Sequence, residues 1–183
     1  PIVVGARIVD ALQTLVSRET NPLRAGVVSV TMFHAGSAYN VIPGAAELGG
    51  TARALDAEVR DALEAGIARV ATGIAAAHGA TAHVTYTRGY PVTVNEAESA
   101  ELAAGVAEAL LGAGKVHRQL DPAMGGEDFA FMLQQVPGAY LWLGQGGSAT
   151  GCALHNPHYD FDDRLLPVGG TLWVRLVQAL MPL

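Results

Sequence analysis

The residues best suited to chemistry lie in a loop near the C-terminus. His155 and His158 are followed by Asp160, between a glycine-rich stretch at 144–151 and an apolar C-terminal segment. Neutral imidazole is the commonest side-chain metal ligand, and a carboxylate can complete such a set. Three ligands in one short loop rarely close a tetrahedral site unaided. The spacing therefore leaves two interpretations open, which are metal ligation and a surface loop with hydrogen-bonded histidines.

A second candidate is the turn at 125–129, Gly-Gly-Glu-Asp-Phe. Two glycines allow close approach of a backbone to a ligand, and the helix expected next would offer free N–H groups to an anion. Asp128 suits a helix cap, whereas Glu127 could act as an acid, a base or a support for a metal ligand. The turn is thus either a capped helix start or part of a site.

A third candidate is the loop at 34–43, which contains Asn40, together with Arg53 on the segment that follows. We expect a hairpin to bring Asn40 and Arg53 close together. An amide and a guanidinium would suit a carboxylate or an amide carbonyl, although turn asparagines and surface arginines are common without any ligand. The other histidines and the cysteine are expected to be structural or solvated: His78, His83, His117 and Cys152.

Composition excludes several classes of function. In 183 residues, 11 Lys and Arg oppose 17 Asp and Glu, a net charge of −6 that argues against a nucleic-acid partner. The single Cys152 cannot form an internal disulfide, which fits a cytoplasmic protein. The apolar run at 165–183 is interrupted by Pro167 and Arg175, so we expect a buried core helix and no membrane partner. Because Pro1 opens directly in a helical pattern, we expect further polypeptide upstream.

Hydrophobic periodicity predicts the elements that must position these residues. In the first half, the pattern predicts a helix at 3–17, strands at 27–33 and 45–54, a helix from Asp56 to about His78, and a strand at 81–88. This order describes a two-layer α+β unit. It would become a β-α-β-β-α-β sandwich if one strand preceded Pro1.

A break near 90–95 suggests a domain boundary. Beyond it we expect Asn95 to cap a helix at 96–111 with Glu98 as its capping-box partner. Strands at 116–120 and 139–144, a helix at 128–135, and a final helix capped by Asp162 or Asp163 complete the prediction.

Four segments together carry a resemblance to a known family. They are Asn40-Val41-Ile42-Pro43, Gly50-Thr51-Ala52-Arg53, Gly126-Glu127-Asp128-Phe129, and Leu154-His155-Asn156-Pro157 before Phe161-Asp162. They resemble, in order and spacing, the hippurate hydrolase and N-acyl-amino-acid amidohydrolase group of the zinc aminoacylase and carboxypeptidase superfamily of dinuclear metallopeptidases. The resemblance implies an α/β fold. Residues 1–92 would be a two-layer ferredoxin-like lid and dimerisation domain without its first strand, and residues 93–183 the C-terminal part of the catalytic domain.

The resemblance also implies roles for individual residues. His155 resembles the family's last metal ligand. Asn40 and Arg53 resemble lid groups that hold the substrate carbonyl and carboxylate, in a site that can belong to the partner subunit. Glu127 and Asp128 resemble the turn that lines the site. The implied cofactors are two divalent ions (zinc, or manganese, cobalt or nickel), and the implied partners are a small N-acyl amino acid and a second subunit bound through the lid.

The family's other metal ligands would precede Pro1. We therefore expect the parent protein to be a metal-dependent amidohydrolase, and the 183-residue chain alone to be inactive and to hold no metal firmly. One alternative is a non-catalytic dimerisation or binding module derived from that family. Another is a ferredoxin-like regulatory domain, which fits 1–90 but leaves 120–163 unexplained.

Overall fold

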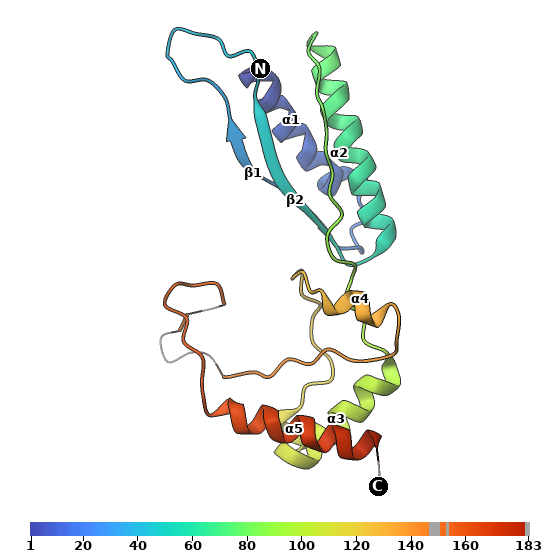
Figure 1. Cartoon of the computed structure of the whole chain (residues 1–183). Coiled ribbons are helices and arrows are strands. Elements are labelled where there is room, and N and C mark those ends of the chain that lie inside the picture. Colours follow the sequence, from blue (N-terminus) through green and yellow to red (C-terminus); the bar gives the residue numbers. More distant parts are fainter. Residues whose placement is uncertain (147–150, 153, 182–183) are drawn as a thin grey trace. The chain divides into compact units, whose positions relative to one another are not determined.

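The computed structural model describes residues 1–146, 151–152 and 154–181. They form two compact units (Figure 1). The first unit comprises Pro1–Val92 and Pro122–Glu127, and the second comprises Thr93–Asp121 and Asp128–Leu183. The short segment Pro122–Glu127 therefore returns to the first unit, which a single boundary near residue 92 does not include.

The first unit contains two helices and a hairpin. Its elements are α1 (Ile2–Thr14), the π-helical turn η1 (Leu15–Glu19), β1 (Gly26–His34), β2 (Glu47–Ala54) and α2 (Ala57–Ala77). β1 and β2 pair antiparallel, with an irregularity between Val30 and Met32. Gly50 lies opposite Val30, and a β carbon there would come 2.2 Å from the Ser29 carbonyl oxygen. These elements confirm the predicted helix, strand, strand, helix order.

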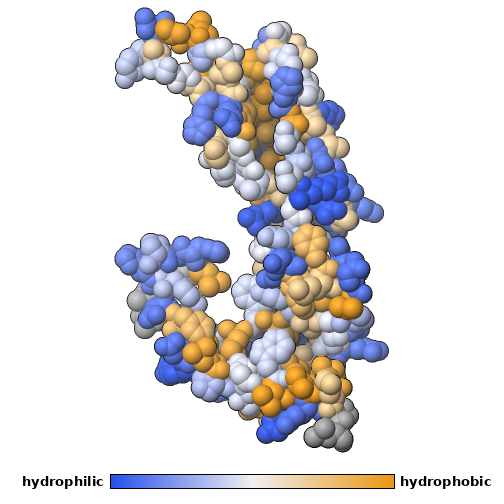
Figure 2. Space-filling view, viewed as in Figure 1, coloured by the Kyte–Doolittle hydropathy of each residue, from blue (hydrophilic) through white to orange (hydrophobic). Residues whose placement is uncertain are grey.

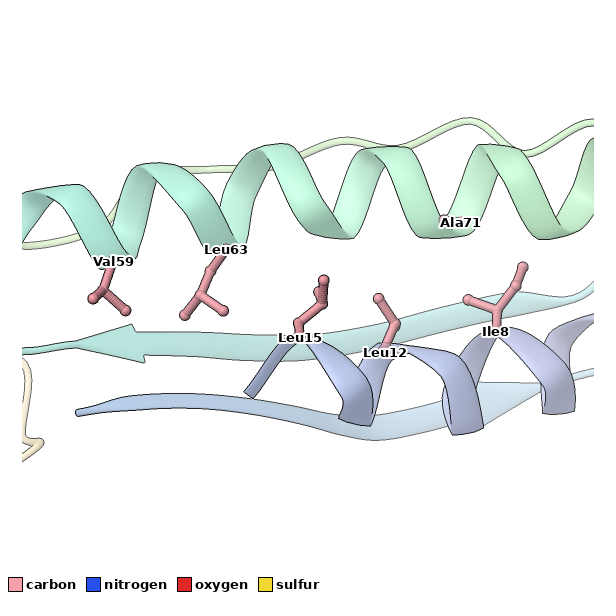
Figure 3. Close-up of a cluster of buried hydrophobic side chains, with 6 residues drawn as sticks. All are labelled: Ile8, Leu12, Leu15, Val59, Leu63 and Ala71. Atoms are coloured by element: carbon pink, nitrogen blue, oxygen red, sulfur yellow. The ribbon is translucent and has the colours of Figure 1, made fainter. Parts of the chain in front are cut away.

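The core of the first unit lies between α1, α2 and one face of the hairpin. Six buried side chains form it, and Figure 3 shows those of α1 and η1 pointing toward those of α2: Ile8, Leu12, Leu15, Val59, Leu63 and Ala71. Val28, Val30, Ala52 and Ala54 pack against this cluster. These strand residues alternate along each strand, as one face of a sheet requires. Two helices on one sheet face give the expected two-layer α+β arrangement.

Asp56 fixes the start of α2. Its Oδ1 accepts a hydrogen bond of 2.8 Å from the Val59 N–H, and its Oδ2 accepts one of 2.9 Å from Arg24 Nε. The Val59 N–H bond, aided by Arg24, lowers the pKa of the Asp56 carboxyl. The N-cap predicted from sequence is thus confirmed, and Arg24 additionally ties it to the chain just before β1.

Asp56→Ala should lower the melting temperature at neutral pH and have less effect in acid. A carboxyl whose pKa is lower in the folded state stabilises the fold above its unfolded pKa of about 3.9, and this contribution is lost as the pH falls through the folded value. Thermal unfolding followed by circular dichroism at about pH 7 and pH 3 would measure this. Asp10→Ala, at an exposed carboxylate of α1, is the control. An equal loss at both pH values would contradict the assignment.

The second unit is built on helices. Its elements are α3 (Ala97–Leu111), the short 3₁₀ helix η2 (Ala113–Lys115), α4 (Phe129–Leu133) and α5 (Leu165–Leu180). α3 packs against α5, with Ala103 and Leu176 buried. No helix among the described residues is both long and apolar enough to cross a membrane.

α5 is not the buried core helix that the sequence predicts. Only Leu176 of this helix is buried. Five large apolar side chains remain exposed, and Figure 2 shows hydrophobic surface in this region: Leu166, Trp173, Val174, Val177 and Leu180. A helix that is apolar on several faces needs packing partners on more than one side. Among the described helices and strands only α3 packs against it, and the Leu143 side chain adds a contact near Gly169.

Three predicted strands are absent from the described residues, where β1 and β2 form the whole sheet. The segments 81–88, 116–120 and 139–144 have strand-like sequences but no strand assignment. In the first of these, Ala82 packs against the core and Arg88 pairs with two acids of α2. A strand needs a neighbour whose backbone completes its hydrogen bonds, and an alternating pattern cannot provide one.

Three predicted helix caps are also wrong. Glu96, not Asn95, caps α3, because its carboxylate accepts hydrogen bonds of 2.9 and 2.7 Å from the N–H groups of Glu98 and Ser99. Asp128 holds the N-cap position of α4, but its side chain makes no capping bond. α5 begins after Arg164 and has no side-chain cap. The neighbouring residue takes over the cap only at α3, whereas Asp162 accepts a 3.1 Å hydrogen bond from the Arg164 N–H just before α5 begins.

Candidate functional site

Arg53 links β2 to the predicted turn. It lies opposite Val27 near the end of β2, and its exposed guanidinium donates a 2.6 Å hydrogen bond from Nη1 to the Met124 carbonyl oxygen. Both residues belong to the first unit. This contact uses one of the five N–H donors of the guanidinium. Arg53 therefore holds the beginning of the turn at 125–129.

Asn40 and Arg53 are not close together, contrary to the prediction. Asn40 is exposed in the loop between His34 and Glu47, whereas Arg53 pairs with the first residues of β1. Figure 1 shows that loop at the opposite end of the hairpin from the start of α2. At about 3.3 Å per residue, the strand from Glu47 to Arg53 covers about 20 Å. The register, which the sequence did not reveal, separates these side chains.

The turn itself contains a half-buried Glu127 and an exposed Asp128. Gly126 lies against Tyr90, since a β carbon at Gly126 would come 2.9 Å from Tyr90 Cδ2. The following helix, α4, has five residues. So short a helix has little macrodipole and would attract an anion at its N-terminus only weakly.

His155 is exposed and has an unusual backbone conformation. Its φ of 68° is the only positive value among the described non-glycine residues. The left-handed region is uncommon outside glycine and clusters at functional positions. The loop is held by Asn156, whose Oδ1 accepts a 2.9 Å hydrogen bond from the His158 N–H.

Gln145 organises the end of this loop, and sequence reasoning missed it. Its Oε1 accepts hydrogen bonds of 3.2 Å from the Tyr159 hydroxyl and from the Asp162 N–H. Arg164 donates to both carboxylate oxygens of Asp162 at 2.8 Å and lowers the pKa of that carboxyl. A single glutamine carries no recognisable pattern, so nothing in the sequence pointed to it. Residues 147–150 of the glycine-rich stretch lie outside the described residues.

The residues that the structure describes do not fit a metal centre on their own. Among them, no group of three or more His, Cys, Asp or Glu side chains could hold an ion. His155, His158 and Asp160 therefore do not form the site that their spacing allowed. Cys152 is half-buried, and His78 occupies the C-cap of α2. His155 can offer one imidazole.

Comparisons with known proteins give the same family as the motifs. The profile of Peptidase family M20/M25/M40 matches residues 3–179. N-acetylcysteine deacetylase of Bacillus subtilis is 37% identical over 181 residues, which cover 99% of this chain and 46% of that protein. Hippurate hydrolase of Campylobacter jejuni is 34% identical over 176 residues, which cover 96% of this chain and 45% of that protein.

A solved structure is similar along the same length. The Bacillus subtilis YXEP protein, described as a dinuclear metal-binding peptidase of the M20 family, has a TM-score of 0.77 and 34% identity. The match covers 99% of this chain and 46% of that one. The chain thus spans less than half the length of these relatives. The similarity confirms the predicted α/β class with its α+β first unit, and the chain belongs to peptidase family M20/M25/M40.

Proposed function

We propose that residues 1–183 are part of a metal-dependent amidohydrolase that cleaves the amide bond of N-acyl amino acids or similar small substrates. The observation that carries this proposal is the family match over residues 3–179. Relatives named for deacetylation of N-acetylcysteine and for hydrolysis of hippurate support the substrate class, since both compounds are acylated amino acids. The single cysteine fits a cytoplasmic location.

We further propose that the first unit is most of a lid and dimerisation domain, and the second the C-terminal part of the catalytic domain. The separation of the chain into two compact units supports this division, and the exposed surface fits additional polypeptide beside them. The chain exposes 13220 Å², whereas two separate folded units of this total mass would expose roughly 10,000 Å². The excess includes the apolar side chains of α5 and fits units that pack against further polypeptide.

In this proposal the parent protein binds two divalent ions, which would polarise the amide carbonyl and activate water. His155 would supply one ligand, and residues outside this chain would supply the others. A single imidazole binds such ions weakly. We therefore infer that the 183-residue chain by itself neither retains metal nor hydrolyses the substrate.

The separation of Asn40 and Arg53 bears on how they would bind substrate. About 20 Å of strand is longer than an acylated amino acid, so one subunit cannot place both side chains on the same small molecule by this hairpin alone. We propose that Arg53 holds the substrate carboxylate in one site while Asn40 reaches the site of the partner subunit. Glu127 and Asp128 would line the site at the turn that Arg53 holds.

The direct test is hydrolysis by the full-length protein. We expect it to release the free amino acid from N-acetyl amino acids or hippurate, to lose activity with EDTA, and to regain it when zinc, manganese, cobalt or nickel is added. The 183-residue chain, assayed in parallel, should be inactive. A full-length protein without metal or hydrolysis would instead favour the non-catalytic dimerisation or binding module.

His155→Ala should lower the metal content of the full-length protein. The substitution removes the one proposed ligand that this chain supplies, so the ion that it contacts should be bound more weakly. Elemental analysis of dialysed protein would measure ions per subunit. His83→Ala, at an exposed histidine of the first unit, is the control. Unchanged metal content in His155→Ala would remove His155 from the site.

A further inference from the structure

We propose that Asn95 is a positioning residue that holds Tyr140 in place and thereby fixes the Asp128 end of the candidate turn. The assignment of that turn to an active site rests on the proposed function. The contacts that support Asn95 all lie within the second unit and do not depend on that function.

The carboxamide of Asn95 makes two hydrogen bonds to one residue. Its Oδ1 accepts from the Tyr140 N–H at 2.8 Å, and its Nδ2 donates to the Tyr140 carbonyl oxygen at 3.0 Å. Opposed residues of antiparallel strands exchange hydrogen bonds in the same way. A further bond of 2.9 Å, from the Glu96 N–H to the Gly138 carbonyl oxygen, extends the pairing. The Asn95 side chain therefore takes the place of a strand's peptide group.

Tyr140 carries this restraint to the turn. Its ring lies 5.9 Å from that of Phe129, centre to centre, and Phe129 directly follows Asp128. Gly138 packs near the other end of α4, since a β carbon there would come 3.2 Å from Leu133 Cδ2. A helix of five residues is not stable alone, so its direction depends on what it packs against. The segment held by Asn95 provides that packing.

Asn95 and Glu96 are adjacent in the chain but make different contacts. Glu96 caps α3 through its carboxylate, whereas Asn95 pairs with a segment more than 40 residues later in the chain. Their variants form a matched pair, because both residues lie just before α3. Removal of the cap should loosen the first turn of α3, and removal of the Asn95 amide should loosen residues 138–142 and 128–133.

Hydrogen exchange measured by mass spectrometry on the 183-residue chain would test this. In Asn95→Ala, exchange should be about tenfold faster in residues 138–142 and 128–133, while α3 keeps its protection. Asn95→Asp, which keeps the acceptor but replaces the donor with a group that repels the Tyr140 carbonyl, should also increase exchange in these two segments. Near-ultraviolet circular dichroism should weaken in both, because Tyr140 and Trp142 meet edge to face. In Glu96→Ala, the faster exchange should appear in α3.

The role in positioning needs a second readout in the full-length protein. Asn95→Ala should lower kcat about tenfold and change KM little, with the metal content unchanged, because the turn is displaced while Arg53 still binds substrate. Faster exchange confined to the first turn of α3 in Asn95→Ala would overturn the proposal, as would an unchanged kcat in an active enzyme. If the full-length protein hydrolyses no acyl amino acid, the proposed function fails, while the exchange measurement still decides whether Asn95 holds Tyr140.

Discussion

Arg53→Ala in the full-length protein should raise KM for an N-acyl amino acid by about tenfold to 100-fold. A hydrogen-bonded contact between a guanidinium and a carboxylate is among the stronger polar interactions, and its loss weakens binding more than it alters the reacting bond. The KM of Arg53→Lys should lie between that of the unmodified enzyme and that of Arg53→Ala, because a lysine keeps the positive charge but not the paired N–H donors. Steady-state kinetics would separate the change in KM from that in kcat.

Two controls distinguish substrate binding from a structural effect. Arg7→Ala removes an exposed arginine of α1 and should leave KM unchanged. A substrate whose carboxylate is converted to an amide should have a high KM with the unmodified enzyme. Arg53→Ala should raise the KM for this substrate little further. If Arg53→Ala raises KM by the same factor for both substrates, the effect comes from the lost contact with the Met124 carbonyl, and Arg53 does not bind the carboxylate.

Mixed dimers would test whether Asn40 acts in the partner's site. Arg53→Ala and Asn40→Ala homodimers should each have low activity. In a heterodimer of the two variants, one site would contain both intact residues and the other would contain neither. Coexpression with two affinity tags should therefore restore activity to about half that of the unmodified dimer. Heterodimers as inactive as either homodimer would place both residues in one site and contradict the proposal.

Leu63→Ala should destabilise the first unit by about 2–5 kcal/mol. Leu63 is 2% exposed and packs with Leu15, also 2% exposed, at the centre of a core of six side chains. Since small domains are stable by about 5–15 kcal/mol, the variant should unfold near the start of a urea titration. Circular dichroism at increasing urea would measure the midpoint, and hydrogen exchange would assign the loss to the first unit.

Leu23→Ala is the matched control, because the same atoms are removed from a side chain that is 93% exposed. Its midpoint should equal that of the unmodified chain. If the urea midpoint of Leu63→Ala also equals that of the unmodified chain, the space left by the removed atoms is filled without loss of stability. The cluster in Figure 3 would then not be the core that stabilises this unit.

Several features could be read from the sequence because they depend on neighbours along the chain. Apolar residues three and four apart specified α1 and α2, alternation specified β1 and β2, and an aspartate at the right place predicted the cap of α2. The motifs around Asn40, Arg53, Glu127 and His155 gave the family, which the comparisons confirm. Their individual roles remain proposals.

The remaining strands could not be predicted in this way. The segment at 81–88 alternates and those at 116–120 and 139–144 resemble short strands, yet none pairs with a neighbouring strand among the described residues. In 139–144 the restraint comes from the Asn95 side chain, which the local pattern had assigned to a helix cap. A local pattern reports which faces of a segment are apolar, and it does not report what lies beside it.

The sequence by itself therefore determined the family, the order of elements in the first unit and the residues able to take part in binding or catalysis. Only the tertiary structure decided which of those residues lie together. The register of β1 and β2 places Arg53 far from Asn40. Arg53 instead donates to the Met124 carbonyl oxygen, and within the second unit the Asn95 side chain pairs with the Tyr140 backbone. The physical reason is that helical and strand periodicity arise from backbone geometry within a segment, whereas register and side-chain pairing are set by contacts between segments distant in the chain.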